Sequence, residues 1–422
     1  MERHTTAMEE NEEIHTLVVG TGAVGGFYGS RLHQPDVKRY VSFVCRSNYN
    51  KVSEEGISIR SKSHGDYKIK PFKVFRTVKE AKEFISDKSE KGSREEGGVK
   101  ISRWNYVILS TKVLLNISDD SLIVSDIFKD DNYQDQRDNR AGSCLVLIQN
   151  GIGFEQIHRN RFPNSKILSA VTVINAEQTE PGSIRHNRWT RISIGPYFNF
   201  DYSNGQHKGS NYDQPKSNSS NSTDQVNLRM IDELVHQTNK DSRSLVELLK
   251  EGGIRDAEMH GEKELQVLRW HKLAVNASMN PTSILSGGLT NSEMVQKSHL
   301  RNHLRETMNE ILEAGRMIFK IQDYPSKFAT PDQILDSTER ASNSEGIRKV
   351  LGGEDKTIIK PSMLIDWENG RELEVEAILG LPAKIARNFG VKLSRVETMY
   401  SLLVELQKAR DHRNSSVKTS KI

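Results

Sequence analysis

Short apolar runs alternate with polar or helical stretches over residues 14–196 of this chain. The runs are four to eight residues long, and in chain order they read LVVG, VSFVC, YVILST, CLVLIQN, ILSAVTVI and ISIGP. Runs of this length bounded by polar residues are typical of buried strands, and helical connections between them are typical of parallel sheets. The pattern therefore predicts an α/β sheet covered on both faces.

Beyond residue 227 the apolar residues recur at a spacing of three or four, which is the period of an amphipathic helix. This spacing predicts helices over 232–250, 261–279, 300–320 and 374–388. Pro281 and Pro382 are expected to mark helix ends or kinks. We therefore expect an α/β domain over 14–196 and a helical domain over 228–409.

Hydrophilic stretches interrupt these patterns. Residues 86–100 and 129–142 are dense in charge and in glycine or asparagine, which predicts surface loops. A stretch rich in serine and asparagine and poor in apolar residues predicts a disordered insertion or linker over 197–227. The polar ends of the chain, over 1–13 and 410–422, are expected to be flexible tails.

The first apolar run leads directly into the glycine-rich segment GTGAVGG, residues 20–26. Gly20, Gly22 and Gly25 have the G-x-G-x-x-G spacing, and the residues that follow read as a helix. In a dinucleotide site the first glycine makes the turn, the second lets the backbone approach a pyrophosphate, and the third allows close helix–strand packing. The alternative is an ordinary strand-to-helix turn, but the order strand, glycine turn and helix favours a nucleotide site.

The second strand of such a fold carries the residue that selects the nucleotide. Where NAD enzymes place an acid on the ribose, this chain has Cys45, Arg46 and Ser47. The Arg46 guanidinium could bind a 2′-phosphate through two hydrogen bonds, with Ser47 or Asn48 adding others. The alternative is a solvated loop arginine, but its position at the end of a strand favours NADP.

Composition and charge exclude several classes of protein. Of 422 residues, 60 are lysine or arginine and 56 are acidic, and this net charge of +4 is too small to indicate nucleic-acid binding. No window approaches eighteen apolar residues, and the acidic amino terminus lacks the features of a signal or transit peptide. Cys45 and Cys144 lie beside apolar runs and predict buried thiols in a reducing compartment. We expect a cytoplasmic protein that does not bind membranes and has no metal site.

Two polar residues follow predicted strands, at the sheet edge where open α/β folds bind ligands. Lys112 closes NYVILSTK, and Asn150 closes SCLVLIQNG. Lys112 could reach the dinucleotide or the substrate, and Asn150 could hydrogen-bond either of them. The alternatives are a lysine that extends into water and an asparagine in an Asn-Gly turn.

The segment WHKLAVNASMNPTSIL carries a polar stripe on an apolar helix. Lys272, Asn276 and Asn280 lie at positions i, i+4 and i+8, so a helix stacks them on one face. Buried lysine and amide groups need partners, and a bound polar substrate would supply them. The alternative is an amphipathic helix whose polar face meets water.

A third segment, PSMLIDWENGRELEVEAILG, offers the Ser362 hydroxyl and the Glu374 carboxylate. A carboxylate in the first turn of a helix is also favoured by the helix dipole alone. Spacing along the chain does not bring Glu374 to Lys272.

Together these motifs resemble those of the ketopantoate reductase (2-dehydropantoate 2-reductase) family, from Ile14 to about Leu406. The resemblance is carried by HTLVVGTGAVGGFYGSRL, STK, QNG, KLAVNASMNPTSIL and SML-D-ENGRELEVEAILG. It implies a Rossmann-like N-terminal domain, an all-helical C-terminal domain and a substrate cleft between them. It also implies that Lys272 is the general acid and that Glu374 lies near it and helps to hold both ligands.

The resemblance also assigns binding residues. Those implied for the substrate are Asn150, Ala176, Asn276, Asn280 and Ser362, together with Asn291: the family asparagine aligns near Thr290, and a one-residue insertion within LSGGLTNSE brings it to Asn291. Those assigned to NADP(H) by the glycine motif and the resemblance together are Gly20, Thr21, Gly22, Ala23, Val24, Gly25, Arg46, Lys112, Asn150 and Glu374.

The implied activity is NADPH-dependent reduction of 2-dehydropantoate to (R)-pantoate in pantothenate biosynthesis, which leads to coenzyme A. The residues alone predict only a nucleotide-dependent reductase of a small polar carbonyl compound. The expected partners are a small 2-oxo acid substrate and NADP(H), with no nucleic acid or membrane; a homodimer is left open, because the sequence does not indicate the oligomeric state. Two alternatives remain open: a reductase of another 2-oxo acid, since fold does not fix function, and a catalytically idle NADP-binding scaffold or sensor. A scaffold has no need of Lys272, which favours an enzyme.

Overall fold

The computed structural model describes residues 13–86, 101–129, 142–198, 200–201, 206–207, 222–342 and 360–419. The two predicted surface loops, the amino-terminal tail and most of the Ser/Asn-rich stretch lie outside these described residues.

A ten-stranded sheet forms the centre of the N-terminal domain. Its strands, from one edge to the other, are β4 (Gly65–Ile69), β3 (Ile57–Ser61), β9 (Ser183–Pro196), β8 (Lys166–Glu180), β7 (Cys144–Leu147), β6 (Tyr106–Leu109), β1 (Ile14–Val19), β2 (Arg39–Val44) and β5 (Val74–Phe75), and β12 (Ala257–Met259) pairs with β9. From β8 to β5 all neighbours are parallel, so their carboxyl ends share one edge of the sheet. From β1 the chain adds β2 and β5 on one side and then β6, β7 and β8 on the other, so the strand order reverses between β1 and β6, which is where such sheets bind ligands.

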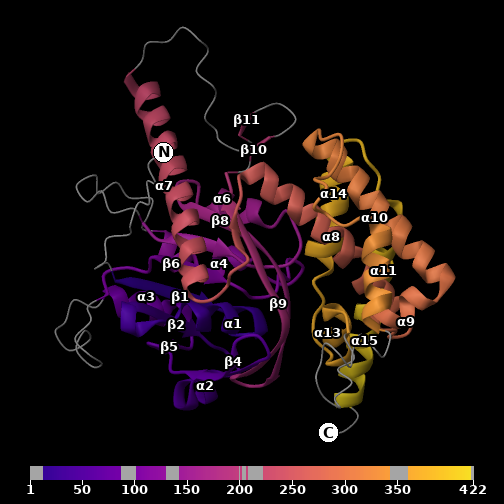
Figure 1. Ribbon diagram of the computed structural model, residues 1–422, viewed down its shortest axis with the longest axis horizontal. Coiled ribbons are helices and arrows are strands. Elements are labelled where there is room, and N and C mark those ends of the chain that lie inside the picture. Colours follow the sequence, from indigo (N-terminus) through magenta and orange to yellow (C-terminus); the bar gives the residue numbers. More distant parts are fainter. Residues whose placement is uncertain are drawn as a thin grey trace.

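Helices cover both faces of this sheet (Figure 1). On one face Val18 and Ile108 pack against α1 (Ala23–Leu32) and α7 (Ser222–Glu251). On the other face Leu17 and Leu109 pack against α3 (Val78–Ser86) and α5 (Ser125–Phe128), and against Phe154 and Phe162, which flank α6 (Glu155–Arg161). Because neighbouring residues of a strand point to opposite faces, continuous apolar runs are what a doubly covered sheet requires.

Smaller elements complete this domain: η1 (Pro35–Val37), α2 (Tyr49–Glu55), α4 (Asp120–Ile123) and the strand pair β10 (Phe200–Asp201) and β11 (Gln206–His207). Both cysteines are free and buried in the domain, as predicted. Burial raises the pKa of the Cys45 thiol to about 11 and that of Cys144 well above its ordinary value.

The domain boundary differs from the prediction, because residues 228–259 belong to the sheet domain and not to the helical domain. Helix α7 begins at Ser222, inside the stretch predicted to be disordered, and its Leu245 and Leu249 join the sheet core. Lys166 at the start of β8 pairs with Asp241 of this helix at 2.5 Å. The helical period of α7 was read correctly, but periodicity does not reveal which layer a helix covers.

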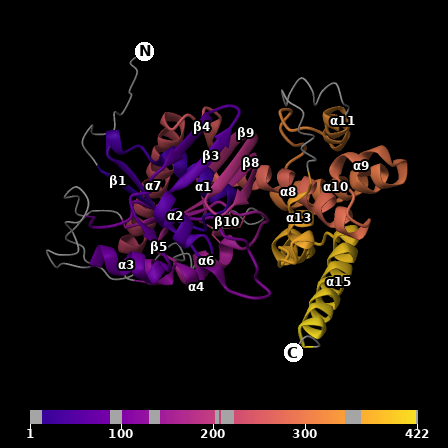
Figure 2. The same cartoon turned by 90° about the horizontal axis from the view of Figure 1, so that it is seen from below.

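The helical domain lies beside the sheet domain (Figure 2). Its elements are α8 (Glu262–Leu285), α9 (Asn291–Gln296), α10 (Ser298–Phe319), α11 (Pro331–Ser342), α13 (Ser362–Glu368), the π-helical turn η3 (Glu376–Gly380), α14 (Leu381–Asn388) and α15 (Ser394–Thr419). Across the described residues every helix is too short or too polar to cross a membrane.

Three details of the helical domain differ from the sequence prediction. Helix α8 continues through Pro281 to Leu285, so this proline does not end it. The helix predicted from Glu374 is instead a π-helical turn followed by α14, with Pro382 in the first turn of α14. The expected carboxyl-terminal tail is helical as far as Thr419, because α15 continues past Arg410, whose guanidinium packs over the Trp367 ring.

Candidate active site

The glycine loop between β1 and α1 has the geometry that a phosphate cradle needs. Gly20 adopts a φ of +97°, and a Cβ placed there would lie 2.9 Å from the Thr111 backbone nitrogen. A Cβ on Gly25 would lie 2.2 Å from Ser110 Oγ, because helix and sheet pack closely at that point. At Gly22, by contrast, no described atom lies within 4 Å of an added Cβ. Of the three glycines in the G-x-G-x-x-G motif, only Gly22, the one expected to face the pyrophosphate, has open space beside it.

The N-terminus of α1 lies at Gly22, beside this open space. Gly22 is its N-cap, and among the described residues no side chain caps the helix. Uncapped N–H groups and the helix dipole favour an anion there. Thr21 holds the loop on β2, through a 3.1 Å contact with Cys45 Sγ, and the Asn48 amide donates to the Thr21 carbonyl at 3.0 Å. Asn48 is therefore buried within the loop support and does not reach out to a phosphate.

Two arginines follow neighbouring parallel strands beside the loop. Arg46 follows β2 and is exposed; burial raises the pKa of the Asp120 carboxyl, and the charge of Arg46 opposes this effect. Arg76 follows β5; its guanidinium lies 3.8 Å from the Tyr49 ring centroid and donates to Asn50 Oδ1 at 3.1 Å. Sequence reasoning missed Arg76, because the two-residue strand β5 that places it gives almost no pattern.

The structure brings the predicted lysine and asparagine together from the two domains. Lys272 lies in α8, and its Nζ donates to Oδ1 of Asn150, which follows β7, at 3.0 Å. Burial, with Arg269 adding positive charge one helical turn away, lowers the pKa of Lys272 to about 8. The Glu374 carboxylate acts in the opposite direction. Lys272 is therefore an ammonium group whose proton is unusually easy to transfer near neutral pH.

Glu374 completes this polar network. It is buried, its Oε1 accepts from the Val113 backbone N–H at 3.0 Å, and it interacts with the Asn150 side chain. Burial raises the pKa of Glu374 to about 7, against the opposing effects of Val113, Lys112 and Asn150. Asn150 thus bridges the ammonium and the carboxylate and keeps them in one hydrogen-bonded unit.

Lys112, which was assigned to the cofactor, forms an ion pair across the domain boundary. Its partner is Asp366 of α13. Ser362 lies one helical turn before Asp366, and at this i, i+4 spacing it shares the face of α13 that meets Lys112. Ser362 is exposed there.

A small cavity lies between the end of β7 and helix α8. Its lining residues are Gln149, Asn150, Gly151, Val171, Arg269, Lys272, Leu273 and Asn276. Asn276 follows Lys272 by one turn along the cavity, as the predicted stripe requires, while Asn280 on the next turn is buried beyond the lining.

Two other residues assigned to the substrate lie outside this cavity lining. Ala176 lies where the pairing of β8 with β9 is irregular. Its side chain packs against the same core as Ala23 and Val24, the first two residues of α1 after the glycine turn. Asn291 begins α9, and its Oδ1 is buried without a hydrogen-bond partner among the described residues. The adjacent Thr290 is the N-cap of α9 and forms a complete capping box with Glu293.

Further residues were not found from the sequence. Gln149 donates to Asp120 Oδ2 at 2.8 Å behind the cavity, and burial raises the pKa of Asp120 to about 6. Arg269 lies three positions before Lys272, a helical spacing that could have drawn attention to it. The partners of both residues are distant in the chain, so their roles depend on the fold.

The chain belongs to the ketopantoate reductase PanE/ApbA family. Residues 16–199 match the family's N-terminal part and residues 264–407 match its C-terminal part. The predicted family and fold class are therefore confirmed.

Several known proteins are similar to this chain over most of its length, at low sequence identity. A 2-dehydropantoate 2-reductase of Nostoc sp. is 24% identical over 389 residues, which are 92% of this chain and 93% of that protein. The structure of a 2-dehydropantoate 2-reductase from Methylococcus capsulatus is 25% identical with a TM-score of 0.62, and the match covers 94% of this chain and 98% of that one. A D-mandelate dehydrogenase solved with NADH and anilino(oxo)acetate shares the fold, at 17% identity, a TM-score of 0.60 and coverage of 94% and 100%.

Proposed function

We propose that this protein reduces 2-dehydropantoate to (R)-pantoate with NADPH, and that Lys272 is the proton donor. The observation that carries the proposal is the Lys272–Asn150–Glu374 network, which places a lysine of lowered pKa at the carboxyl edge of the sheet. The glycine loop opens on the same edge, after β1. A proton donor and a dinucleotide cradle at one edge are what a carbonyl reductase needs.

The residues of the loop fit a dinucleotide. The open space at Gly22 and the uncapped N-terminus of α1 would hold the pyrophosphate, and Arg46 would hold a 2′-phosphate. When bound, the reduced nicotinamide supplies the hydride for the carbonyl carbon. The protein's own contribution is orientation, exclusion of water and a proton.

Lys272 supplies that proton to the carbonyl oxygen. Its ammonium stabilises the negative charge that develops on the oxygen and then transfers a proton to it. Asn150 Oδ1 accepts one of the three N–H bonds of the ammonium, which leaves the others to face the cavity. Asn276, also in the cavity lining, can bind a hydroxyl or carboxylate of the substrate.

The pH dependence of the reaction follows from the lowered pKa of Lys272. The rate of reduction should fall as pH rises through about 8, because Lys272 then loses the proton that it donates. Replacing Glu374 by glutamine removes a negative charge that raises the pKa of Lys272. The pH at which the rate begins to fall should therefore be lower in this variant. The profile of kcat/KM measures both effects, and a rate that kept rising beyond pH 8 would exclude Lys272 as the acid.

Nucleotide selectivity should depend on Arg46. Replacing it by alanine removes a charge-assisted hydrogen bond, and we expect KM for NADPH to rise roughly tenfold with KM for NADH unchanged. The neighbouring Arg76→Ala should act in the same direction. Arg60, exposed on β3, provides the control substitution. Equal losses with both nucleotides would show that Arg46 does not contact the 2′-phosphate.

The proposed activity is tested by incubating the purified protein with NADPH and ketopantoate and identifying the product on a chiral column. We expect one (R)-pantoate for each NADPH consumed. Tight NADPH binding without any consumption would favour a scaffold or sensor.

A second candidate is the reduction of another 2-oxo acid. It is favoured by the shared fold of D-mandelate dehydrogenase and by the two apolar residues of the cavity lining, Val171 and Leu273. Greater activity on an aryl 2-oxo acid than on ketopantoate would select this candidate.

A further inference from the structure

A buried ion pair lies one helical turn from Lys272 and crosses the domain boundary. Arg269 Nη1 of α8 and Glu155 Oε1 at the start of α6 are 2.8 Å apart. Their side chains are only 2% and 1% exposed. Taking two charges out of water is costly, so an isolated pair of this kind is weak evidence for a gain in stability. The other contacts of the pair therefore decide its role.

Arg269 binds the segment that carries Asn150. Its Nη2 donates to the carbonyl of Gly151, the residue after Asn150, at 2.6 Å. Its Nη1 also donates to Ser169 of β8. The guanidinium thus ties α8 directly to the segment that follows β7 and to Ser169 of the neighbouring strand β8.

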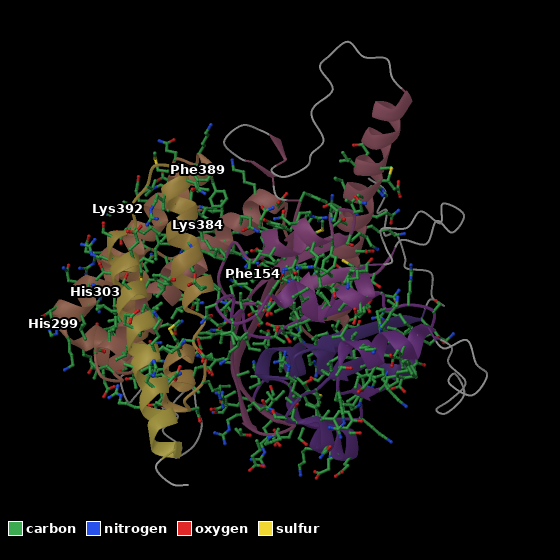
Figure 3. All side chains as sticks on the ribbon, turned by 180° about the vertical axis from the view of Figure 1, so that it is seen from behind. Phe154, His299, His303, Lys384, Phe389 and Lys392 are labelled. Atoms are coloured by element: carbon green, nitrogen blue, oxygen red, sulfur yellow. The ribbon has the colours of Figure 1, made fainter. Side chains whose placement is uncertain are left out.

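Glu155 and Phe154 form the other side of this arrangement. Glu155 Oε1 accepts from Ser169 Oγ at 3.0 Å and from Gln266 Nε2 of α8 at 3.4 Å. The Arg269 guanidinium lies 5.2 Å from the centroid of the Phe154 ring, and Figure 3 shows Phe154 where the sheet domain meets the helical domain. The contacts of Arg269 therefore join α8 to the segment after β7, to β8 and to α6, and Glu155 adds a contact between α6 and β8.

We propose that Arg269 and Glu155 form a positioning unit, which holds the Asn150–Gly151 segment against α8 so that the Lys272 ammonium stays on Asn150 Oδ1. This inference rests on the proposed role of Lys272 as proton donor. Arg269 borders the cavity, but its guanidinium is bound to Gly151, Ser169 and Glu155, so we assign the pair a role that acts through Asn150 and Lys272. A lysine at position 269 could not replace the guanidinium, since one ammonium cannot match the planar fork that reaches Gly151, Ser169 and Glu155 together.

The charge of Arg269 has a second effect on the same lysine. The charged groups around Lys272 are Arg269 on α8, Glu155 on α6, Glu374 before η3 and, beyond Glu374, the Lys112–Asp366 pair. Among them Arg269 lowers the pKa of Lys272 and Glu374 raises it. Removing Arg269 should therefore move the titration of Lys272 to higher pH.

The test compares the single variants R269M and E155M with the double variant R269M/E155M and with R269K. Each single variant leaves one buried charge unpaired and should lower Tm, whereas the double variant should recover most of that loss. A positioning role predicts that the double variant still has kcat reduced by about tenfold to a hundredfold with ketopantoate, while its Kd for NADPH is unchanged. Full recovery of both Tm and kcat in the double variant would show that the pair is only structural.

The variant R269K separates the effect of the guanidinium's geometry on kcat from the effect of its charge. It also keeps the proposal testable if the double variant does not fold. It keeps the positive charge, so kcat should fall while the alkaline limb of the pH profile stays near that of the wild type. A wild-type kcat in R269K would overturn the proposal.

A readout independent of turnover distinguishes this proposal from the proposed function. The rate at which acetic anhydride acetylates Lys272, followed by peptide mass spectrometry against pH, reports its titration, with the exposed Lys263 of α8 as internal reference. We expect the midpoint in R269M/E155M to lie above that of the wild type, and an unchanged midpoint would contradict the electrostatic effect of Arg269. If the wild type fails to reduce ketopantoate, the proposed function fails, while the acetylation result stands by itself.

Discussion

Replacement of Lys272 by alanine should lower kcat for ketopantoate reduction by about 10³-fold, which is within the range for loss of a general acid. Among the residues that the structure describes, Lys272 and Arg269 are the cationic side chains of the cavity lining, and both Nη atoms of Arg269 are already bound to Gly151, Ser169 and Glu155. Arginine at position 272 should not restore the rate, because a guanidinium keeps its proton at neutral pH. Steady-state kinetics with saturating NADPH measure the change.

The cofactor provides the control for this experiment. Kd for NADPH should change little in Lys272→Ala, because the phosphate contacts expected of the glycine loop and Arg46 do not involve Lys272. Lys263→Ala, an exposed change on the same helix, should leave both kcat and Kd unchanged. Lys272→Ala with near-normal turnover would show that another group donates the proton.

Replacement of Gly22 by alanine should abolish most NADPH binding without harming the fold. No described atom lies within 4 Å of the added Cβ, so the protein itself accepts the methyl group, but the methyl group occupies the space where the pyrophosphate would approach. We expect Kd for NADPH to rise by at least tenfold with Tm unchanged, as measured by fluorescence titration and thermal unfolding.

Two other glycines are matched controls for Gly22→Ala. Gly261, where an added Cβ also meets no described atom within 4 Å, should accept alanine with no change in Kd. Gly25→Ala should instead lower Tm, because its Cβ would lie 2.3 Å from the Gly20 carbonyl oxygen. Normal NADPH binding by Gly22→Ala would place the pyrophosphate elsewhere.

The strands at the centre of the sheet and the glycine loop could be predicted because their signals are local. The run ending at Val19 and the spacing of Gly20, Gly22 and Gly25 already contain the strand, the turn and the start of α1. The strand β5, only two residues long, was missed because its pairing with β2 depends on a neighbour in space and not on pattern.

The candidate site could be predicted only in part, for the same reason. Helical spacing places Lys272 and Asn276 on one side of α8, and both line the cavity. The meeting of Lys272 with Asn150, 122 positions away, follows from the fold, and the expectation that Glu374 joins them came from the family resemblance. The ion pairs of Lys112 and Arg269 depend on partners in the other domain, which no local pattern indicates.

The most direct test of the proposed function is kcat/KM for ketopantoate with NADPH, measured beside phenylglyoxylate and other 2-oxo acids and repeated with NADH. We expect ketopantoate with NADPH to give the highest value and Lys272→Ala to remove it. A higher value for another 2-oxo acid, or activity that survives in Lys272→Ala, would contradict the proposed substrate or the proposed proton donor respectively.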